Sequence, residues 1–315
     1  MPWILCGVGL ALLVFAGDAL VKGAVNLALR LGIPALIVSL TVVAFGTSAP
    51  ELLVVIDAVI HGKPGLALGN VVGSNTANIL LVLGVPAMLA TMHSSHFDTR
   101  RSYYMMLAAT VVFIGFCLTG ELVFWHGLVM LLALIATLVD QYIAGRKARA
   151  ASEAAVDEED LEGADPGMKG WKIAVFLVAG LIGLPLGANL LVDNASIIAR
   201  SFGISETVIG LTLVAVGTSL PELATTVMAA LRRQADVAMG NVIGSNMFNL
   251  LGIMGIGAMV GNIPVEDSMR SFDLWVMLGA SLLLVPFALM KVDITRLWGV
   301  VLTALYLVYV SLILF

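Results

Sequence analysis

Long apolar stretches constrain this chain more than any other feature of its sequence. Hydrophobic residues make up 60% of its 315 residues and charged residues 12%, whereas about 25% of the residues in a soluble domain are charged. Its mean hydropathy is +1.05. A transmembrane helix needs about 20 mostly apolar residues in a row. The chain is therefore predicted to be an all-α integral membrane protein.

Polar interruptions divide the apolar sequence into ten predicted transmembrane helices. We expect them at residues 3–29, 34–60, 66–91, 103–119, 122–144, 172–199, 205–231, 237–260, 272–290 and 294–314. No basic segment precedes the first helix and no small-residue cleavage pattern follows it, so we expect a retained helix and not a signal peptide. Cys6 and Cys117 both lie in apolar segments and indicate neither a disulfide nor a metal site.

Gly145 to Gly170 form the only long polar segment. Its composition is typical of a solvated linker. The acidic run Asp157–Asp160 suggests calcium sensing as an alternative, but it lacks the ligand spacing of an EF-hand loop. We expect two five-helix units, residues 1–144 and 172–315, joined by a linker at residues 145–171.

The basic residues predict how the chain is oriented in the membrane. If the N-terminus is external, twelve Lys and Arg residues fall in inward loops and three in outward loops, while Lys22 lies within the first helix. Cytoplasmic loops carry the excess of basic residues in membrane proteins. Both termini are therefore predicted to be external and the acidic linker cytoplasmic.

Two motifs recur at the same distance along the chain. "GTSAPE" (Gly46–Glu51) returns as "GTSLPE" (Gly217–Glu222), and "GNVVGSNTAN" (Gly69–Asn78) returns as "GNVIGSNMFN" (Gly240–Asn249), both shifted by 171 positions. Each half holds five predicted helices, an odd number, so the second half must enter the membrane in the opposite sense. Inverted repeats of this kind are typical of secondary transporters, whose sites lie near the bilayer midplane.

The first motif predicts a break in each helix that contains it. Pro50 has no N–H, so the Gly46 carbonyl loses its usual helical partner. Pro221 and Gly217 repeat this arrangement. An unsatisfied carbonyl is costly in lipid, so such a break persists only where something replaces the missing bond. A bound cation would do so.

The side chains around each break supply oxygen atoms. Glu51 follows Thr47 by four residues and Ser48 by three, which places all three on one helical face. The next helix adds Ser74 and Asn78, and the second half repeats the set with Glu222, Ser245 and Asn249. Carboxylate, hydroxyl, amide and carbonyl oxygens suit hard cations. The absence of His and Cys from the motifs argues against zinc or copper.

Each hydroxyl or amide taken alone is explained equally well by helix packing. The glutamates are different, because a carboxylate in mid-membrane costs roughly 2.5 kcal/mol or more. Their recurrence within one motif therefore favours function. Asp18 and Lys22 lie four residues apart on the first helix, with Asn189 and Asp193 as counterparts; we expect an ion pair or an interface role ahead of substrate contact.

The paired motifs resemble the two α-repeats of the cation/calcium exchanger superfamily, and most closely its bacterial sodium/calcium antiporter branch. The resemblance covers nearly the whole chain. It implies a secondary-active antiporter of the cell (inner) membrane that exports Ca²⁺ in exchange for Na⁺ by alternating access. It also implies no enzymatic activity, no cofactor, no nucleic acid and no obligate protein partner.

The resemblance further implies a set of ion ligands. Glu51 and Glu222 would bind Ca²⁺ and share the Na⁺ sites. The other side-chain ligands would be Thr47, Ser48, Ser74 and Asn78 from the first half, and Thr218, Ser219, Ser245 and Asn249 from the second. The main-chain carbonyls of Ala44 and Ala215 would complete Na⁺ sites. The helices that hold Asp18 and Asp193 would slide against the remaining bundle.

One position departs from the family pattern. Several family members carry Asp where this chain has Asn249, and this acid is typical of potassium-dependent relatives. Two carboxylates then balance one Ca²⁺ or two Na⁺. A proton-coupled or potassium-dependent exchanger is the near alternative, and a cation channel is an alternative of another class. An intramembrane hydrolase is disfavoured because no nucleophile–base pair or H-E-x-x-H motif is present.

Overall fold

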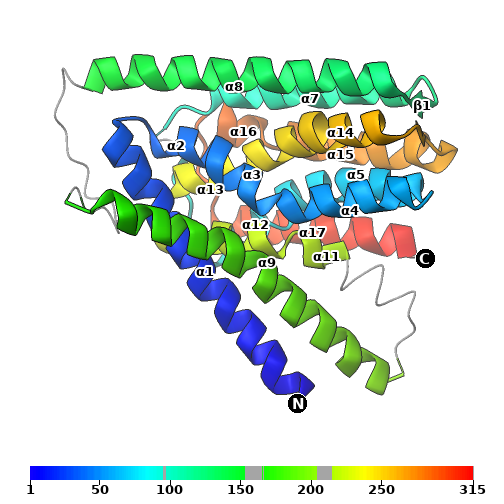
Figure 1. Ribbon diagram of the computed structural model, residues 1–315, viewed down its shortest axis with the longest axis horizontal. Helices are drawn as coiled ribbons and strands as arrows, with labels where there is room; N and C mark the ends of the chain where they lie inside the picture. The colour runs from blue at the N-terminus through cyan, green and yellow to red at the C-terminus, as the bar shows by residue number, and fades with distance from the viewer. Residues whose placement is uncertain (95–96, 153–164, 166, 204–214, 315) are drawn as a thin grey trace.

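The computed structural model describes residues 1–94, 97–152, 165, 167–203 and 215–314, and these are almost entirely helical. Most of the helices run roughly alongside one another, and α1 and α9 cross them obliquely as a pair (Figure 1). The polypeptide therefore divides into a main helical bundle and a two-helix arm, each apolar on its outer surface.

The five predicted helices of the first half are all present, and two of them are interrupted. The first is α1 (Pro2–Leu31). The second comprises α2 (Ala35–Val38), the π-helix η1 (Ser39–Val43), α3 (Ala44–Thr47) and α4 (Ala49–Ile60). The third comprises α5 (Pro64–Leu80) and α6 (Gly84–Leu89), and it is followed by α7 (Arg100–Cys117) and α8 (Phe124–Ser152).

The second half repeats this order. It begins with α9 (Gly170–Ser201), continues with α11 (Ala215–Thr218) and α12 (Leu220–Leu231), and then with α13 (Ala235–Met247), the π-helix η4 (Phe248–Ile253) and α14 (Met254–Val260). The π-helix η5 (Met269–Asp273), α15 (Leu274–Leu283) and α16 (Val285–Ala288) follow, and α17 (Arg296–Leu314) is last. Residues 204–214, which include the start of the predicted seventh helix, lie outside the described residues.

Seven helical segments of the described chain are long and apolar enough to cross a membrane, and the bent pair Ala35–Thr47 and Ala49–Ile60 makes an eighth. The prediction of an all-helical membrane fold is confirmed. One boundary was wrong, because α8 continues to Ser152, eight residues beyond the predicted end. The Ala, Arg and Lys residues there are strong helix formers. The acidic run Asp157–Asp160 lies outside the described residues.

Two short β pairings, which the sequence did not predict, join the halves. Strand β1 (Glu121–Leu122) pairs antiparallel with β2 (Ile263–Pro264), and Met92 forms an isolated bridge with Ile294. Ile263 follows Met92 by the repeat distance of 171 positions. Each pairing thus ties the loop after the third helix of one half to a loop beyond the fourth helix of the other. The pairings preserve the repeat symmetry.

Small residues allow α1 and α9 to pack closely. A Cβ atom added at Gly180 would lie 2.5 Å from the Leu20 Cβ, and one at Gly187 would lie 3.0 Å from the Gly9 carbonyl oxygen. Such close approach is typical of membrane helices, where packing replaces the hydrophobic effect. The two helices therefore form one closely packed pair beside the bundle.

The arm contacts the two halves of the bundle unequally. On α1, a Cβ atom added at Gly17 would lie 3.0 Å from the Ala224 carbonyl oxygen of α12, so these helices are in close contact. Helix α9 makes no comparable contact with α4, the counterpart of α12, within the described residues. Leu53 of α4, the counterpart of Ala224, is 69% exposed. The structure thus departs from exact twofold symmetry at the arm.

Candidate cation site

The same backbone break occurs at Ser48 and Ser219. Their φ and ψ angles are −86° and 3° in the first half and −87° and 3° in the second. Pro50 and Pro221 then occupy the first turn of the helix that follows, where a missing N–H removes no helical bond. Each proline therefore both ends one helix and begins the next.

The bend is centred on these serines, whereas Gly46 and Gly217 leave space for a neighbouring helix. A Cβ atom added at Gly46 would lie 2.0 Å from the Cδ2 of Leu181, and one at Gly217 would lie 2.6 Å from the Cγ2 of Val192. Leu181 and Val192 both belong to α9. The glycines thus let the arm approach both helix breaks.

The two glutamates lie in the first turns of α4 and α12 and are fully buried. Ser48 connects them, because its Oγ donates a hydrogen bond of 3.1 Å to the Oε1 of Glu222 and it lies three residues before Glu51. The positive end of a helix dipole stabilises a carboxylate at each position. One acidic group from each half therefore faces the same region.

Buried amides bring the second motif of each half into the same region. The Nδ2 of Asn78 donates to the Oδ1 of Asn246 at 3.1 Å, and the Nδ2 of Asn246 donates to the main-chain oxygen of Asn75 at 3.2 Å. Ser74 and Asn249 are also buried. Helices α5 and α13 thus meet through side chains that the repeated motif supplies.

Many polar atoms of these residues have no hydrogen-bond partner within the described part of the chain. They are both carboxyl oxygens of Glu51, the Oε2 of Glu222, the Oγ atoms of Ser219 and Ser245, the Oδ1 atoms of Asn75 and Asn78, and the Oδ1 and Nδ2 of Asn249. Each such atom costs about 1–3 kcal/mol when buried unpaired. All but one are oxygens, which are the ligands that hard cations prefer.

The described residues contain no group of three or more His, Cys, Asp or Glu side chains that could hold a metal ion. The region instead combines two carboxyl groups with neutral hydroxyl and amide oxygens. This ligand chemistry disfavours zinc and copper, which prefer imidazole or thiolate ligands. It suits cations that must be released again, because neutral oxygens bind them less tightly than carboxylates.

Thr47 and Ala44 form hydrogen bonds beside the first helix break. The Thr47 hydroxyl lies 3.3 Å from the Ala44 carbonyl oxygen and 3.3 Å from the Oδ1 of Asn241. The Ala44 carbonyl also accepts the Ser48 N–H at 3.1 Å. In the second half the N–H of Ser219 donates to the Val216 carbonyl at 3.1 Å. The serine N–H at each break is therefore bonded to a carbonyl of the preceding turn.

The remaining predicted ligands are placed by their helices. Thr218 is half-buried at the end of α11, and Ala215 begins that helix, although its side chain lies outside the described part. The structure places the backbones of both beside the second break.

Three buried asparagines of this region were not identified from the sequence. Asn75 and Asn246 join α5 to α13, and Asn241 contacts Thr47 across the halves. All three belong to the repeated G-N-V-x-G-S-N segment. Their recurrence at the repeat distance was the signal that could have identified them.

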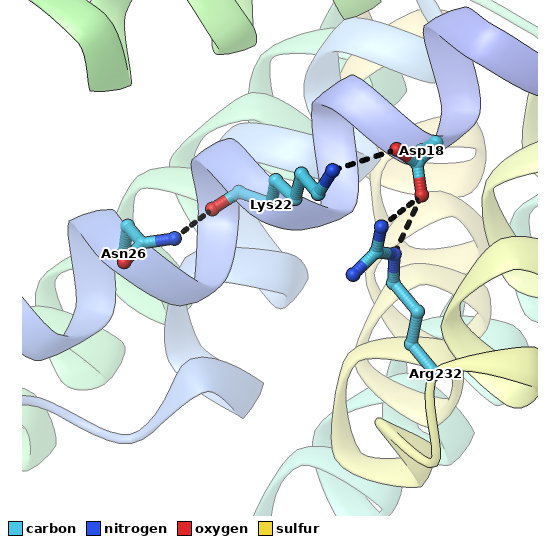
Figure 2. A network of polar contacts seen from close by, with 4 residues as sticks. All are labelled: Asp18, Lys22, Asn26 and Arg232. Carbon is cyan, nitrogen blue, oxygen red and sulfur yellow. Dashed lines mark hydrogen bonds and ion pairs between the residues drawn. The ribbon is translucent and has the colours of Figure 1, made fainter. Parts of the chain in front are cut away.

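A second polar network connects the arm to the bundle (Figure 2). Asp18 and Lys22 form an ion pair with an N–O distance of 3.3 Å, as the sequence predicted. Asp18 also pairs with Arg232 at the end of α12, whose Nε lies 2.6 Å from its Oδ1. Asn26 donates to the Lys22 main chain at 2.8 Å. The partner on α12 was not foreseen, and Asp193 is exposed.

Comparison with known proteins gives consistent matches along the chain. The sequence profile of the family described as sodium/calcium exchanger protein matches residues 1–143 and 172–315. Putative antiporter CaxA of Alkalimonas amylolytica is 36% identical over 90% of this chain and 88% of its own length. Sodium/calcium exchanger MaX1 of Methanosarcina acetivorans is 34% identical over 96% and 95%. A structure of the sodium-calcium exchanger NCX_Mj, soaked with Na⁺ and Sr²⁺, matches with a TM-score of 0.83 at 31% identity, covering 98% and 97%.

Proposed function

The chain belongs to the sodium/calcium exchanger protein family, and from this premise we propose that it exports Ca²⁺ in exchange for Na⁺. The observation that carries the proposal is the hydrogen bond from Ser48, three residues before Glu51, to Glu222 of the other half, among buried oxygen atoms without hydrogen-bond partners. A cation bound there would compensate the buried charge and satisfy the unpaired oxygens.

Competition for the two carboxylates provides the coupling in this proposal. Together they carry a formal charge of −2, which one Ca²⁺ or two Na⁺ would balance, so both ions cannot occupy the site together. The other ligands we propose are the side chains of Thr47, Ser48, Ser74, Asn78, Thr218, Ser219, Ser245 and Asn249 and the carbonyls of Ala44 and Ala215. Their neutral oxygens would complete the coordination shell and allow release.

Alternating access, in the same proposal, comes from sliding of the α1–α9 arm across the bundle. The inverted halves would be residues 1–144 and 172–315, and the linker at residues 145–171 would join them. The arm already contacts both helix breaks through Leu181 and Val192. Its unequal packing against α12 and α4 supports the existence of a second state in which the roles of the halves are exchanged.

For orientation we propose a multi-pass protein of the cell (inner) membrane with both termini external. The support is the distribution of Lys and Arg residues between alternate loops. Single cysteines introduced at Lys63 and at Gly167, both exposed, report opposite sides. A membrane-impermeant maleimide should label Lys63→Cys in intact cells and Gly167→Cys only after permeabilisation. The reverse pattern would refute this orientation.

The function is tested by ion flux in proteoliposomes. Sodium-loaded vesicles containing the protein should take up ⁴⁵Ca²⁺ when diluted into sodium-free medium. Glu51→Gln and Glu222→Gln should each reduce this uptake to background, because the remaining charge cannot balance Ca²⁺. Asp267→Asn is the matched control, because that carboxylate is 93% exposed and should not affect uptake.

The same vesicles distinguish the alternatives. Uptake driven by a proton gradient without sodium would indicate proton coupling, and sodium-independent single-channel currents would indicate a pore. Normal sodium-driven uptake by either glutamine variant would refute the proposed site.

A further inference from the structure

Asn241 is a buried amide of α13 that connects three helices. Its Oδ1 lies 3.3 Å from the Thr47 hydroxyl of α3. Its Nδ2 donates to the hydroxyl of Thr226 at 3.2 Å and to the main-chain oxygen of Glu222 at 3.4 Å, both on α12. The side chain is completely shielded from solvent. It therefore links the Thr47 of one half to the glutamate-bearing helix of the other.

The contacts on α12 fix which way the amide points. A carbonyl oxygen can only accept a hydrogen bond, so the group that faces the Glu222 carbonyl must be the NH₂. The oxygen of the Asn241 amide must then face Thr47. The amide is thus held as an acceptor for the Thr47 hydroxyl, and the assignment follows from the bonding network itself.

The direction of the Thr47 proton decides which oxygens are available to a cation. A hydroxyl coordinates a cation through a lone pair and must donate its single proton elsewhere. Three acceptors lie within reach: the Ala44 carbonyl and the Asn241 amide, each at 3.3 Å, and the Glu222 carboxylate. Donation to Asn241 leaves the Thr47 lone pairs free. It also spares the Ala44 carbonyl, which already accepts the Ser48 N–H.

We propose that Asn241 is a positioning residue that accepts the Thr47 hydroxyl proton and so makes the oxygens of Thr47 and Ala44 available to the transported cation. This inference rests on the proposed function, because it takes Thr47 and Ala44 as ligands. Asn241 itself contacts no ion in this arrangement. It acts on affinity through Thr47.

The first half lacks the anchor that holds this amide. Asn70 is the counterpart of Asn241 at the repeat distance, but Val55 stands where the second half has Thr226. Val55 is fully buried and offers no acceptor, and the Nδ2 of Asn70 has no hydrogen-bond partner within the described residues. The two halves therefore differ in how firmly the amide is oriented. In the proposal, Asn241 has a larger effect on cation affinity than Asn70.

The test is equilibrium binding of ⁴⁵Ca²⁺ to purified protein, with the melting temperature as a measure of folding. Asn241→Leu should weaken binding roughly tenfold, the upper range for one neutral hydrogen bond. In a Thr47→Val background the same change should have no further effect, because Asn241 acts through the Thr47 hydroxyl. Thr226→Val, which is nearly isosteric, should weaken binding roughly threefold by releasing the amide.

The comparison variant is Asn70→Leu, for which we expect a weakening smaller than that of Asn241→Leu. Additive losses of Ca²⁺ affinity in the Asn241→Leu/Thr47→Val double variant would overturn the proposal. If Asn241→Leu fails to fold, Thr226→Val takes its place, and unchanged binding in that variant would overturn the proposal. Wild-type protein that binds no Ca²⁺ would overturn both the proposed function and this inference. Wild-type binding with no change in Asn241→Leu would overturn the role of Asn241 alone.

Discussion

Asn249 is a single neutral residue at a position where an acidic side chain would change the charge of the proposed site. It is fully buried, and neither of its amide atoms has a hydrogen-bond partner within the described residues. Its counterpart in the first half, Asn78, is also an amide. The proposed site therefore contains two acidic side chains and no third, which matches one Ca²⁺ but leaves no charge for an additional cation.

Adding a carboxylate at this position should strengthen binding of divalent ions. Two unit charges 4 Å apart interact by about 4 kcal/mol at an effective dielectric constant of 20. Even after loss of most of this energy to desolvation, Asn249→Asp should lower the Kd for Ca²⁺ roughly tenfold, or about 1.4 kcal/mol. Calorimetric titration measures the affinity, and flux assays should show slower exchange because Ca²⁺ leaves less readily.

Asn249→Leu serves as the control for this charge change. It removes the amide oxygen without adding charge, so it should weaken Ca²⁺ binding. Equal affinities in the wild type and in Asn249→Asp would show that this side chain lies too far from the ion to act.

At the scale of elements, the ion pair between Asp18 and Arg232 connects the arm to the bundle. Its side chains are 23% and 19% exposed, so water screens it only in part. Lys22 also contacts Asp18 and competes for it. Because the pair joins α1 to the end of α12, it contributes to the unequal packing of the arm against the two halves.

A double-mutant cycle measures this pair. Asp18→Asn and Arg232→Gln should each lower the melting temperature. Their coupling energy should be about 1–2 kcal/mol, since partly buried partners in one network couple more strongly than surface pairs. The pair between Asp267 and Arg270 is the control, because Asp267 is 93% exposed and exposed pairs contribute about 0.2–1 kcal/mol. A coupling no larger than the control would mean that α1 is held by apolar packing alone.

At the scale of the whole molecule, the inverted halves predict a second packing of the arm. In this structure Gly17 of α1 packs against Ala224 of α12. The counterparts of these two residues in the opposite halves, 171 positions away, are Ala188 of α9 for Gly17 and Leu53 of α4 for Ala224. Leu53 is now largely exposed. If the halves exchange conformations, Ala188 and Leu53 come together while the contact of Gly17 is lost.

A disulfide can capture that state. The two native cysteines are first replaced by alanine, and Ala188→Cys and Leu53→Cys are then introduced together. A disulfide requires Cα atoms about 4.4–6.8 Å apart. The pair should therefore cross-link only when transport brings these two positions together. Oxidation should stop ⁴⁵Ca²⁺ exchange and reduction should restore it. Variants with only one of the two cysteines control for oxidation itself. Full exchange by cross-linked protein would refute the sliding of the arm.

Local sequence was sufficient to predict the membrane-spanning helical fold, the inverted halves and the types of ligand atom at the proposed site. Hydropathy, helix breaks and the chemistry of Glu51 or Asn78 are properties of a few consecutive residues, so they can be read from the chain directly. Recurrence at one repeat distance then indicated which of these residues belong together.

Which side chains meet depends on the tertiary structure. Ser48 lies 174 positions from Glu222, Thr47 lies 194 from Asn241, and Asp18 lies 214 from Arg232. Such partners are brought together by the packing of helices from opposite halves, which no local pattern encodes. The structure also showed that the bend lies at Ser48 and that Gly46 is needed for the close approach of α9. The asymmetry between the halves arises in the same way, from where the arm lies and not from the repeated motifs.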